Sequence, residues 1–147
     1  MTITERIQGE LVSAAKAGDR VRLATLRLLL DSLNKEAKEA RAQLDEQREV
    51  AVLKRERKRR AEAADGFRKG GREESALAED AEVKIIEEYL PAEMSDEELE
   101  RLVADALAET GADSQREMGK VMAAAMSKAG GRADGKRVSE LVRTRLA

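Results

Sequence analysis

The last third of the chain repeats one pattern three times, and this pattern constrains the fold more than any other feature. A capping residue comes first, apolar residues at three- and four-residue spacing follow, and a glycine or the end of the sequence closes the segment. Ser95 with Glu98, and Ser114 with Glu117, have the spacing of capping boxes, and Asp134 is a suitable cap for a last helix. Because each segment has one apolar stripe, the pattern predicts a three-helix bundle.

The preceding part of the chain predicts about four more helices. Thr2 and Glu5 have capping-box spacing at the start of a first helix that ends at Gly18. Asp19 caps a second helix that is apolar around much of its circumference, and a third helix is expected near residues 46–69. Aromatic residues make up 1% of the chain, and no segment alternates between apolar and polar residues as a strand does. The fold class expected is all-α.

Pro91 marks the best domain boundary. Proline cannot continue a helix, and it disfavours helical geometry at the residue before it. The pattern beyond the stretch PAEMS becomes shorter and more regular. We therefore expect an N-terminal helical domain of about four helices at 1–90 and a C-terminal three-helix domain at 91–147.

Basic residues are concentrated in the predicted third helix. Residues 48–72 contain ten basic and four acidic residues, and Arg57 and Arg60 fall on the same face as apolar side chains. Such arginines must reach solvent or meet acids. The next helix has an acidic residue at every seventh position, at Glu73, Asp80 and Glu87. We expect this acidic ridge to lie beside the basic helix; the alternative is that the KRERKRR run is a nucleic-acid-binding arm.

The residue types that are missing exclude several kinds of chemistry. The chain has no cysteine and no histidine, which excludes thiol nucleophiles, disulfides and imidazole acid–base catalysis. No calcium-loop spacing is present, and we expect no metal and no other cofactor. The N-terminal sequence lacks a signal-peptide core, and the longest apolar run, Val121–Met126, is too short to cross a membrane. We expect a soluble, cytoplasmic protein.

The stretch GGRADGKR, residues 130–137, has the G-x-x-x-x-G-K spacing of a nucleotide-binding P-loop. That loop needs a strand before it and a serine or threonine after the lysine, whereas here a helix precedes it and Arg137 follows the lysine. The simpler interpretation is a turn in which glycine ends one helix and Asp134 caps the next.

The basic side chains around this turn suit an RNA backbone. They are Lys120, Arg132, Lys136, Arg137 and Arg143. The start of the last helix adds free N–H groups and a positive dipole end, which favour an anion. The alternative is a solvated basic face that serves solubility.

Longer stretches of the sequence resemble a known family. The matching segments are VKIIEEYLPAEMSDEELERLV, the later MGKVM, the turn G-x-A-D-G-x-x-V, and AAKAGDRVRLATLRLLLDSLNKE near the N-terminus. The chain is similar to the GatB/YqeY family, which comprises stand-alone YqeY-like proteins and the C-terminal tail of the GatB component of the aspartyl/glutamyl-tRNA amidotransferase. The residues of this chain that match the family's motifs are Gly119, Lys120, Ala133, Asp134, Gly135 and Val138.

The resemblance implies a role beside tRNA. In the amidotransferase, the equivalent tail holds tRNA, while other domains and subunits transfer ammonia from glutamine to an activated group on tRNA. The present chain lacks that catalytic region, so carbon–nitrogen ligase activity with glutamine as donor would come to it only by association. We therefore expect a tRNA-binding, translation-associated accessory module without autonomous catalysis. The alternative is a protein-interaction module that docks onto an amidotransferase-like or other assembly.

Overall fold

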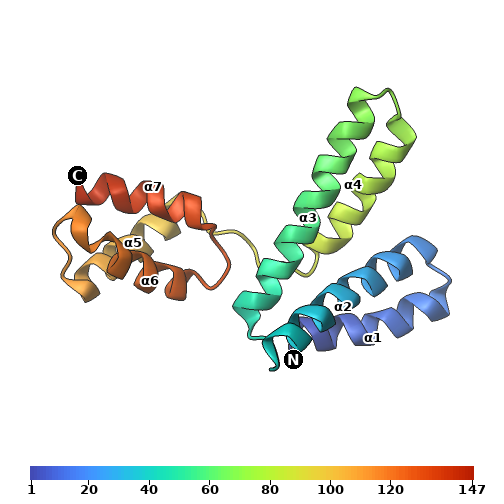
Figure 1. Cartoon of the computed structure of the whole chain (residues 1–147), viewed down its shortest axis with the longest axis horizontal. Coiled ribbons are helices and arrows are strands. Elements are labelled where there is room, and N and C mark those ends of the chain that lie inside the picture. The colour runs from blue at the N-terminus through green and yellow to red at the C-terminus, as the bar shows by residue number, and fades with distance from the viewer. The chain divides into compact units, whose positions relative to one another are not determined.

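The computed structural model describes residues 1–147 and consists of helices and connecting turns, with no strand (Figure 1). The helices are α1 (Ile3–Ala17), α2 (Arg20–Ala40), α3 (Glu46–Lys69), α4 (Glu73–Glu87), α5 (Asp96–Thr110), α6 (Met118–Ala129) and α7 (Gly135–Leu146), with a 3₁₀ turn, η1 (Gln115–Glu117), before α6. The all-α prediction is confirmed. None of these helices combines the length and the apolar composition needed to span a membrane.

The contacts divide the chain into two compact units, Met1–Leu90 and Pro91–Ala147. The N-terminal unit contains α1 to α4, and the C-terminal unit contains α5 to α7. Each unit has its own cluster of buried apolar side chains.

Two helical hairpins, α1–α2 and α3–α4, make up the N-terminal unit (Figure 1). The capping box at Thr2 and Glu5 is present, and it starts α1. Gly18 then adopts a left-handed conformation with φ +70°, and the Asp19 carboxylate accepts a hydrogen bond from the Arg22 backbone N–H. The apolar core of this unit contains Ile7, Ala14, Leu26, Leu29, Leu33, Leu44, Val52, Leu53, Ile86 and Tyr89.

The C-terminal unit is a three-helix arrangement around a small aliphatic core. Its buried residues are Leu99, Leu102, Val103, Ala106, Val121, Ala125, Ala129, Ala133, Val138, Val142 and Leu146. These are the residues on the apolar stripes of the sequence, together with Ala129 and Ala133 at the turn between α6 and α7. The methionines Met118, Met122 and Met126 pack against this core and are partly buried.

Two of the predicted capping boxes form differently from the expectation. The Ser95 hydroxyl caps α5 by accepting from the Glu98 N–H at 3.1 Å, but the Glu98 carboxylate does not return the bond, because it pairs with Arg132. Ser114 makes no side-chain cap, and it precedes the 3₁₀ turn instead of α6. The Glu117 carboxylate accepts from the Asp113 backbone N–H at 2.8 Å. The prediction of a capping box at Ser114 is wrong.

Ion pairs join α3 to α4, as the sequence predicted, although the partners differ in part. Arg60 is 8% exposed, and its guanidinium reaches the carboxylates of Glu56 at 2.8 Å and Glu82 at 3.1 Å. Glu82 lies outside the predicted ridge. Two members of that ridge, Glu73 and Asp80, pair with Arg68, whereas the third, Glu87, is exposed and makes no ion pair.

Glu56 is a buried carboxylate at the centre of this network. Burial acts to raise its pKa, but hydrogen bonds from Arg60 and Ser32, together with the charges of Arg60 and Arg59, outweigh burial and lower the pKa. A carboxyl group whose pKa is lower in the folded chain stabilises the fold above its ordinary pKa. That stabilisation is lost as the pH falls through the lowered value.

We predict that Glu56→Gln lowers the free energy of unfolding at pH 7 by about 2 kcal/mol, because it leaves Arg60 buried with only one carboxylate partner. The difference from wild type should shrink as the pH falls below the ordinary glutamate pKa of 4.5. Urea unfolding followed by circular dichroism at several pH values measures both effects. Glu62→Gln, at an exposed acid on the same helix without an ion pair, is the matched control and should change stability by less than ~0.5 kcal/mol. Equal stability of the two variants at pH 7 would contradict the prediction.

Candidate nucleic-acid interface

The stretch at residues 130–137 is a turn between α6 and α7. Gly130 and Gly131 have φ values of +56° and +92°, which a residue with a side chain rarely adopts. The Asp134 carboxylate then caps α7 by accepting from the Arg137 N–H at 2.8 Å. Because the stretch follows a helix, it lacks the strand–loop–helix context of a P-loop.

Arg132 serves to hold the turn in place. Its Nε donates to the Ala92 carbonyl at 2.9 Å, and its Nη2 pairs with the Glu98 carboxylate at 2.7 Å. The Arg132 carbonyl in turn accepts from the Met94 N–H at 2.8 Å. The guanidinium is thus occupied by the segment that leads into α5, and it is less available to a ligand than the sequence suggested.

Arg137 and Lys128 also have acidic partners. Arg137 pairs with Asp96 at 2.9 Å, and Lys128 pairs with Glu109 at 2.8 Å, which raises the pKa of the lysine. The Asp96 side chain is 96% exposed, so its pair with Arg137 is a weak surface interaction. A phosphate could replace Asp96 at Arg137 at little cost.

The other three predicted cations, Lys120, Lys136 and Arg143, are exposed and make no ion pair. They do not form one cluster. Lys136 lies in the first turn of α7 and Arg143 lies seven residues later, which places them about 10 Å apart along the helix.

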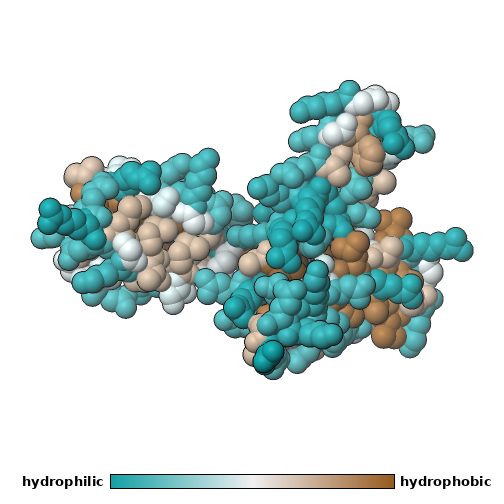
Figure 2. All heavy atoms as spheres, in the orientation of Figure 1, coloured by the Kyte–Doolittle hydropathy of each residue, from teal (hydrophilic) through white to brown (hydrophobic).

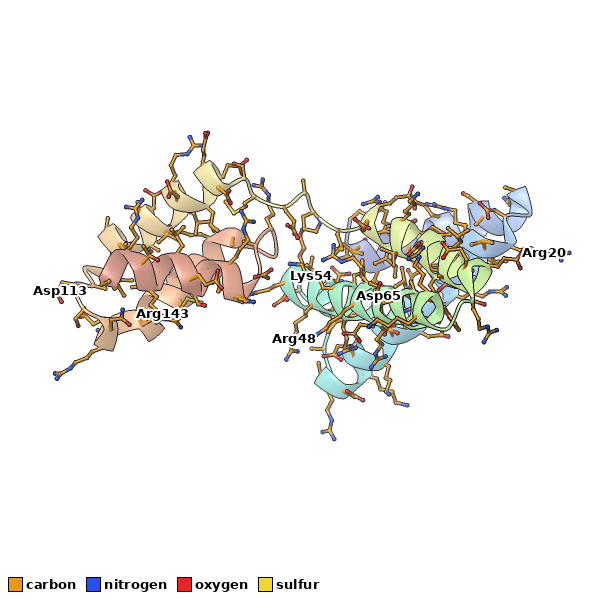
Figure 3. The ribbon with its side chains drawn as sticks, turned by 90° about the horizontal axis from the view of Figure 1, so that it is seen from above. Arg20, Arg48, Lys54, Asp65, Asp113 and Arg143 are labelled. Atoms are coloured by element: carbon orange, nitrogen blue, oxygen red, sulfur yellow. The ribbon has the colours of Figure 1, made fainter.

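Lys120 lies at the same end of the α6–α7 pair as Arg143. A short turn joins α6 to α7, and the Gln115 side chain donates to the Arg143 carbonyl at 3.3 Å, so the beginning of α6 lies near the end of α7. Figure 3 shows Arg143 and Asp113, two residues before Gln115, toward the same end of the C-terminal unit. The basic surface therefore has two parts: Lys120 and Arg143 at one end of the α6–α7 pair, and Arg132, Lys136 and Arg137 at the other.

Each of the two unpaired lysines directly follows a glycine. Gly119 and Gly135 are exposed helical residues, and a Cβ atom at either position would meet no atom within 4 Å. Neither glycine has a positive φ, so the fold itself does not require glycine there. An exposed glycine beside a lysine at the start of a helix leaves the backbone open to close approach by a ligand.

Lys120 has one acidic neighbour, Glu117. The pKa of Glu117 is lowered, first by the hydrogen bond from the Asp113 backbone N–H and also by the charge of Lys120. No group of three or more acidic side chains is arranged to hold a metal ion. The chemistry that this surface offers is therefore ammonium and guanidinium donors directed to solvent, which suits phosphate oxygens.

Sequence reasoning did not single out Arg145, which is exposed in the last turn of α7 and makes no ion pair. It lines a hollow with Glu97, Glu100 and Arg101 of α5, on the side of α7 away from Arg143, so it does not belong to this surface. Sequence reasoning also gave Arg132 too large a part in RNA binding, because no sequence pattern shows that this loop arginine donates a hydrogen bond to the carbonyl of Ala92.

Comparison with known proteins adds one finding. The family model described as Yqey-like protein matches residues 4–146, nearly the whole chain. No curated protein matches the chain.

Proposed function

Because the chain belongs to the YqeY-like family, we propose that it is a tRNA-binding accessory protein of translation whose C-terminal unit contacts the phosphate backbone. The observation that carries the proposal is the group of exposed cations without acidic partners, Lys120, Lys136 and Arg143, on two packed helices. The resemblance to the amidotransferase tail suggests tRNA as the RNA. The chain itself is assigned no catalytic step, since it contains neither histidine nor cysteine.

Binding of this kind depends on counterion release. Each lysine or arginine that neutralises a phosphate displaces a condensed cation, so the affinity falls steeply as salt rises. Phosphate contacts position the protein on the RNA but do not read its sequence. Arg137 can join the interface when a phosphate takes the place of Asp96, whereas Arg132 keeps its structural contacts.

We predict that the triple variant Lys120→Ala, Lys136→Ala, Arg143→Ala binds tRNA at least tenfold more weakly than wild type at about 50 mM salt. The slope of log affinity against log salt should fall by about 2 to 3, because each lost phosphate contact removes ~1. Fluorescence anisotropy with labelled tRNA over a salt series measures both quantities.

The matched control removes the same charge from the N-terminal unit: Lys16→Ala, Arg20→Ala, Arg27→Ala. These three side chains are exposed and make no ion pair. The control variant should keep most of the affinity. Equal losses in the two triple variants would show that net charge alone drives binding and would contradict this interface.

The two exposed glycines give an independent prediction. Gly119→Ala and Gly135→Ala should leave the fold intact and raise the free energy of unfolding by up to about 1 kcal/mol, because alanine loses less entropy in a helix. They should nevertheless weaken tRNA binding, because the added methyl group blocks close approach of a phosphate to the backbone. Thermal unfolding and anisotropy on the same samples check the two effects. More stable variants with unchanged affinity would show that the phosphate does not approach the backbone there.

A second candidate function, docking to a protein partner, is favoured by exposed apolar side chains. Apart from Met1, the large hydrophobic residues that are exposed are Val12, Val21, Leu28 and Leu77, and all of them lie in the N-terminal unit. Figure 2 shows hydrophobic side chains at the surface of this unit. Val21 and Leu28 are seven residues apart and so share one face of α2, where apolar side chains favour contact with another protein more than contact with RNA.

We predict that, if docking is the function, a tagged chain retains a defined protein from nuclease-treated extract. Leu28→Lys should reduce that retention, while Arg20→Ala, on the same helix, should leave it unchanged. Loss of all co-purifying protein after nuclease treatment would assign the partners to shared RNA and would overturn the docking function.

A further inference from the structure

Residues 48–59 of α3 present a second basic face, which belongs to the N-terminal unit. Its five cations are Arg48, Lys54, Arg55, Lys58 and Arg59. Lys54 is half-buried and the other four are exposed. At 100° per residue these positions cover one side of the helix over about 16 Å of its length. Figure 3 shows Arg48 and Lys54 on this part of α3 and Asp65 further along.

The two acids that lie between these cations, Glu49 and Glu56, do not neutralise that face, because the fold turns them inward, whereas Glu46 in the first turn of α3 is exposed. Glu49 is 2% exposed and accepts hydrogen bonds from the backbone N–H and the hydroxyl of Thr4, both at 2.7 Å. Glu56 is 4% exposed and is held by Arg60, Ser32 and Arg59. The surface is therefore more basic than the sequence count suggests.

Three of the five cations are free of any ion pair. Arg48, Lys54 and Lys58 have no acidic partner, while Arg55 only approaches Glu36 at 3.9 Å and Arg59 pairs with Glu56 at 3.3 Å. Like charges held along one helix face repel each other, and an anionic partner relieves that repulsion.

The composition of the face favours a nucleic acid over a protein. Ala51 is the only apolar residue among the exposed positions between Arg48 and Arg59. A protein interface has an apolar core that excludes water, and a single alanine cannot form one. Phosphate contacts need only cations and hydrogen-bond donors.

The burial of the two aromatic side chains indicates which kind of RNA this face of α3 is suited to bind. Proteins that bind single strands stack the bases on exposed aromatic rings. The chain has one tyrosine and one phenylalanine. Tyr89 is 2% exposed, with Arg6 over its ring, and Phe67 is partly buried, with Arg72 over its ring. Because neither ring is free to stack on a base, the face offers cations for phosphates and no aromatic platform for bases, which favours a double-stranded segment over a single strand.

We propose that this face of α3 is a second RNA contact, which binds the phosphate backbone of a double-stranded segment. The inference rests on the proposed RNA-binding function and extends it to the N-terminal unit and to duplex RNA. Arg48, Lys54 and Lys58 bind phosphates directly, and Arg55 adds to the field. Arg59 stays with the buried Glu56.

The test uses the full chain and two labelled probes: an RNA duplex of about 20 base pairs, longer than the ~16 that a double-stranded-RNA-binding domain spans, and one of its strands alone. The α3 variant is Arg48→Ala, Lys54→Ala, Lys58→Ala. Alanine favours a helix, and none of the three side chains has an ion-pair partner, so circular dichroism should stay unchanged. The control is the variant at Lys16, Arg20 and Arg27, which removes the same charge; Figure 3 shows Arg20 at the far end of the N-terminal unit from Arg48.

Wild type should bind the duplex more tightly than the single strand. The α3 variant should bind the duplex at least tenfold more weakly than the control does, and its salt slope should fall by about 2 to 3. Affinity for the duplex within twofold of the control, or a preference of wild type for the single strand, overturns the inference.

Comparison with the Lys120, Lys136, Arg143 variant separates the two proposals. If only that variant loses RNA binding, the C-terminal interface stands and the α3 contact is wrong. If only the α3 variant loses binding, the α3 contact stands and the C-terminal interface is wrong. If wild type binds none of tRNA, duplex and single strand, both proposals are wrong.

Discussion

The buried guanidinium of Arg60 is the interaction on which the α3–α4 hairpin depends. It lies between Glu56 of its own helix and Glu82 of α4, and its Nη1 also donates to the Glu56 carbonyl at 3.0 Å. A charge at this depth is tolerated because it is paired on both sides, and no buried side-chain nitrogen or oxygen lacks a hydrogen-bond partner. The same interaction has a consequence at the surface. By drawing Glu56 inward, it turns an acid away from the solvent-facing side of α3, so Lys54 and Lys58 have no ion-pair partner, while Arg59 keeps its pair with Glu56.

In the C-terminal unit, too, some basic side chains are held by acids or carbonyl groups and others are unpaired. Arg132 fixes the turn to the segment before α5, Lys128 joins α6 to α5, and Arg137 joins α7 to the start of α5. These contacts hold a small aliphatic core together and leave other cations on α6 and α7 free. In the proposed function, Arg132 and Lys128 serve the fold and the unpaired cations serve binding, while Arg137 is shared between the two, because its surface pair with Asp96 can give way to a phosphate.

The sequence predicted the helices well and the individual contacts poorly. Helix ends follow local rules, so Gly18, Asp19 and Asp134 could be assigned from a few neighbouring residues. The failure at Ser114 has a local cause as well, because the Glu117 carboxylate bonds the Asp113 N–H and a 3₁₀ turn forms first. The contact between the basic helix and the acidic ridge was predictable from seven-residue spacing. The choice of Glu82 as the partner of Arg60 was not, because it depends on how the two helices rotate against each other.

The candidate site shows the same limit, since counting charges along the chain cannot separate a free lysine from a paired one. The net charge of the chain is −2, and this total conceals two basic faces. What distinguishes the free cations of both faces, Lys120 and Lys136 on one and Lys54 and Lys58 on the other, is that none of them forms an ion pair, which only the packing decides. Long-range electrostatic attraction acts through these uncompensated charges, and the paired ones contribute little beyond a few ångströms. In the function proposed above, a surface built in this way, with no aromatic side chain available for stacking, would distinguish nucleic acids by the geometry of their phosphates and not by their bases.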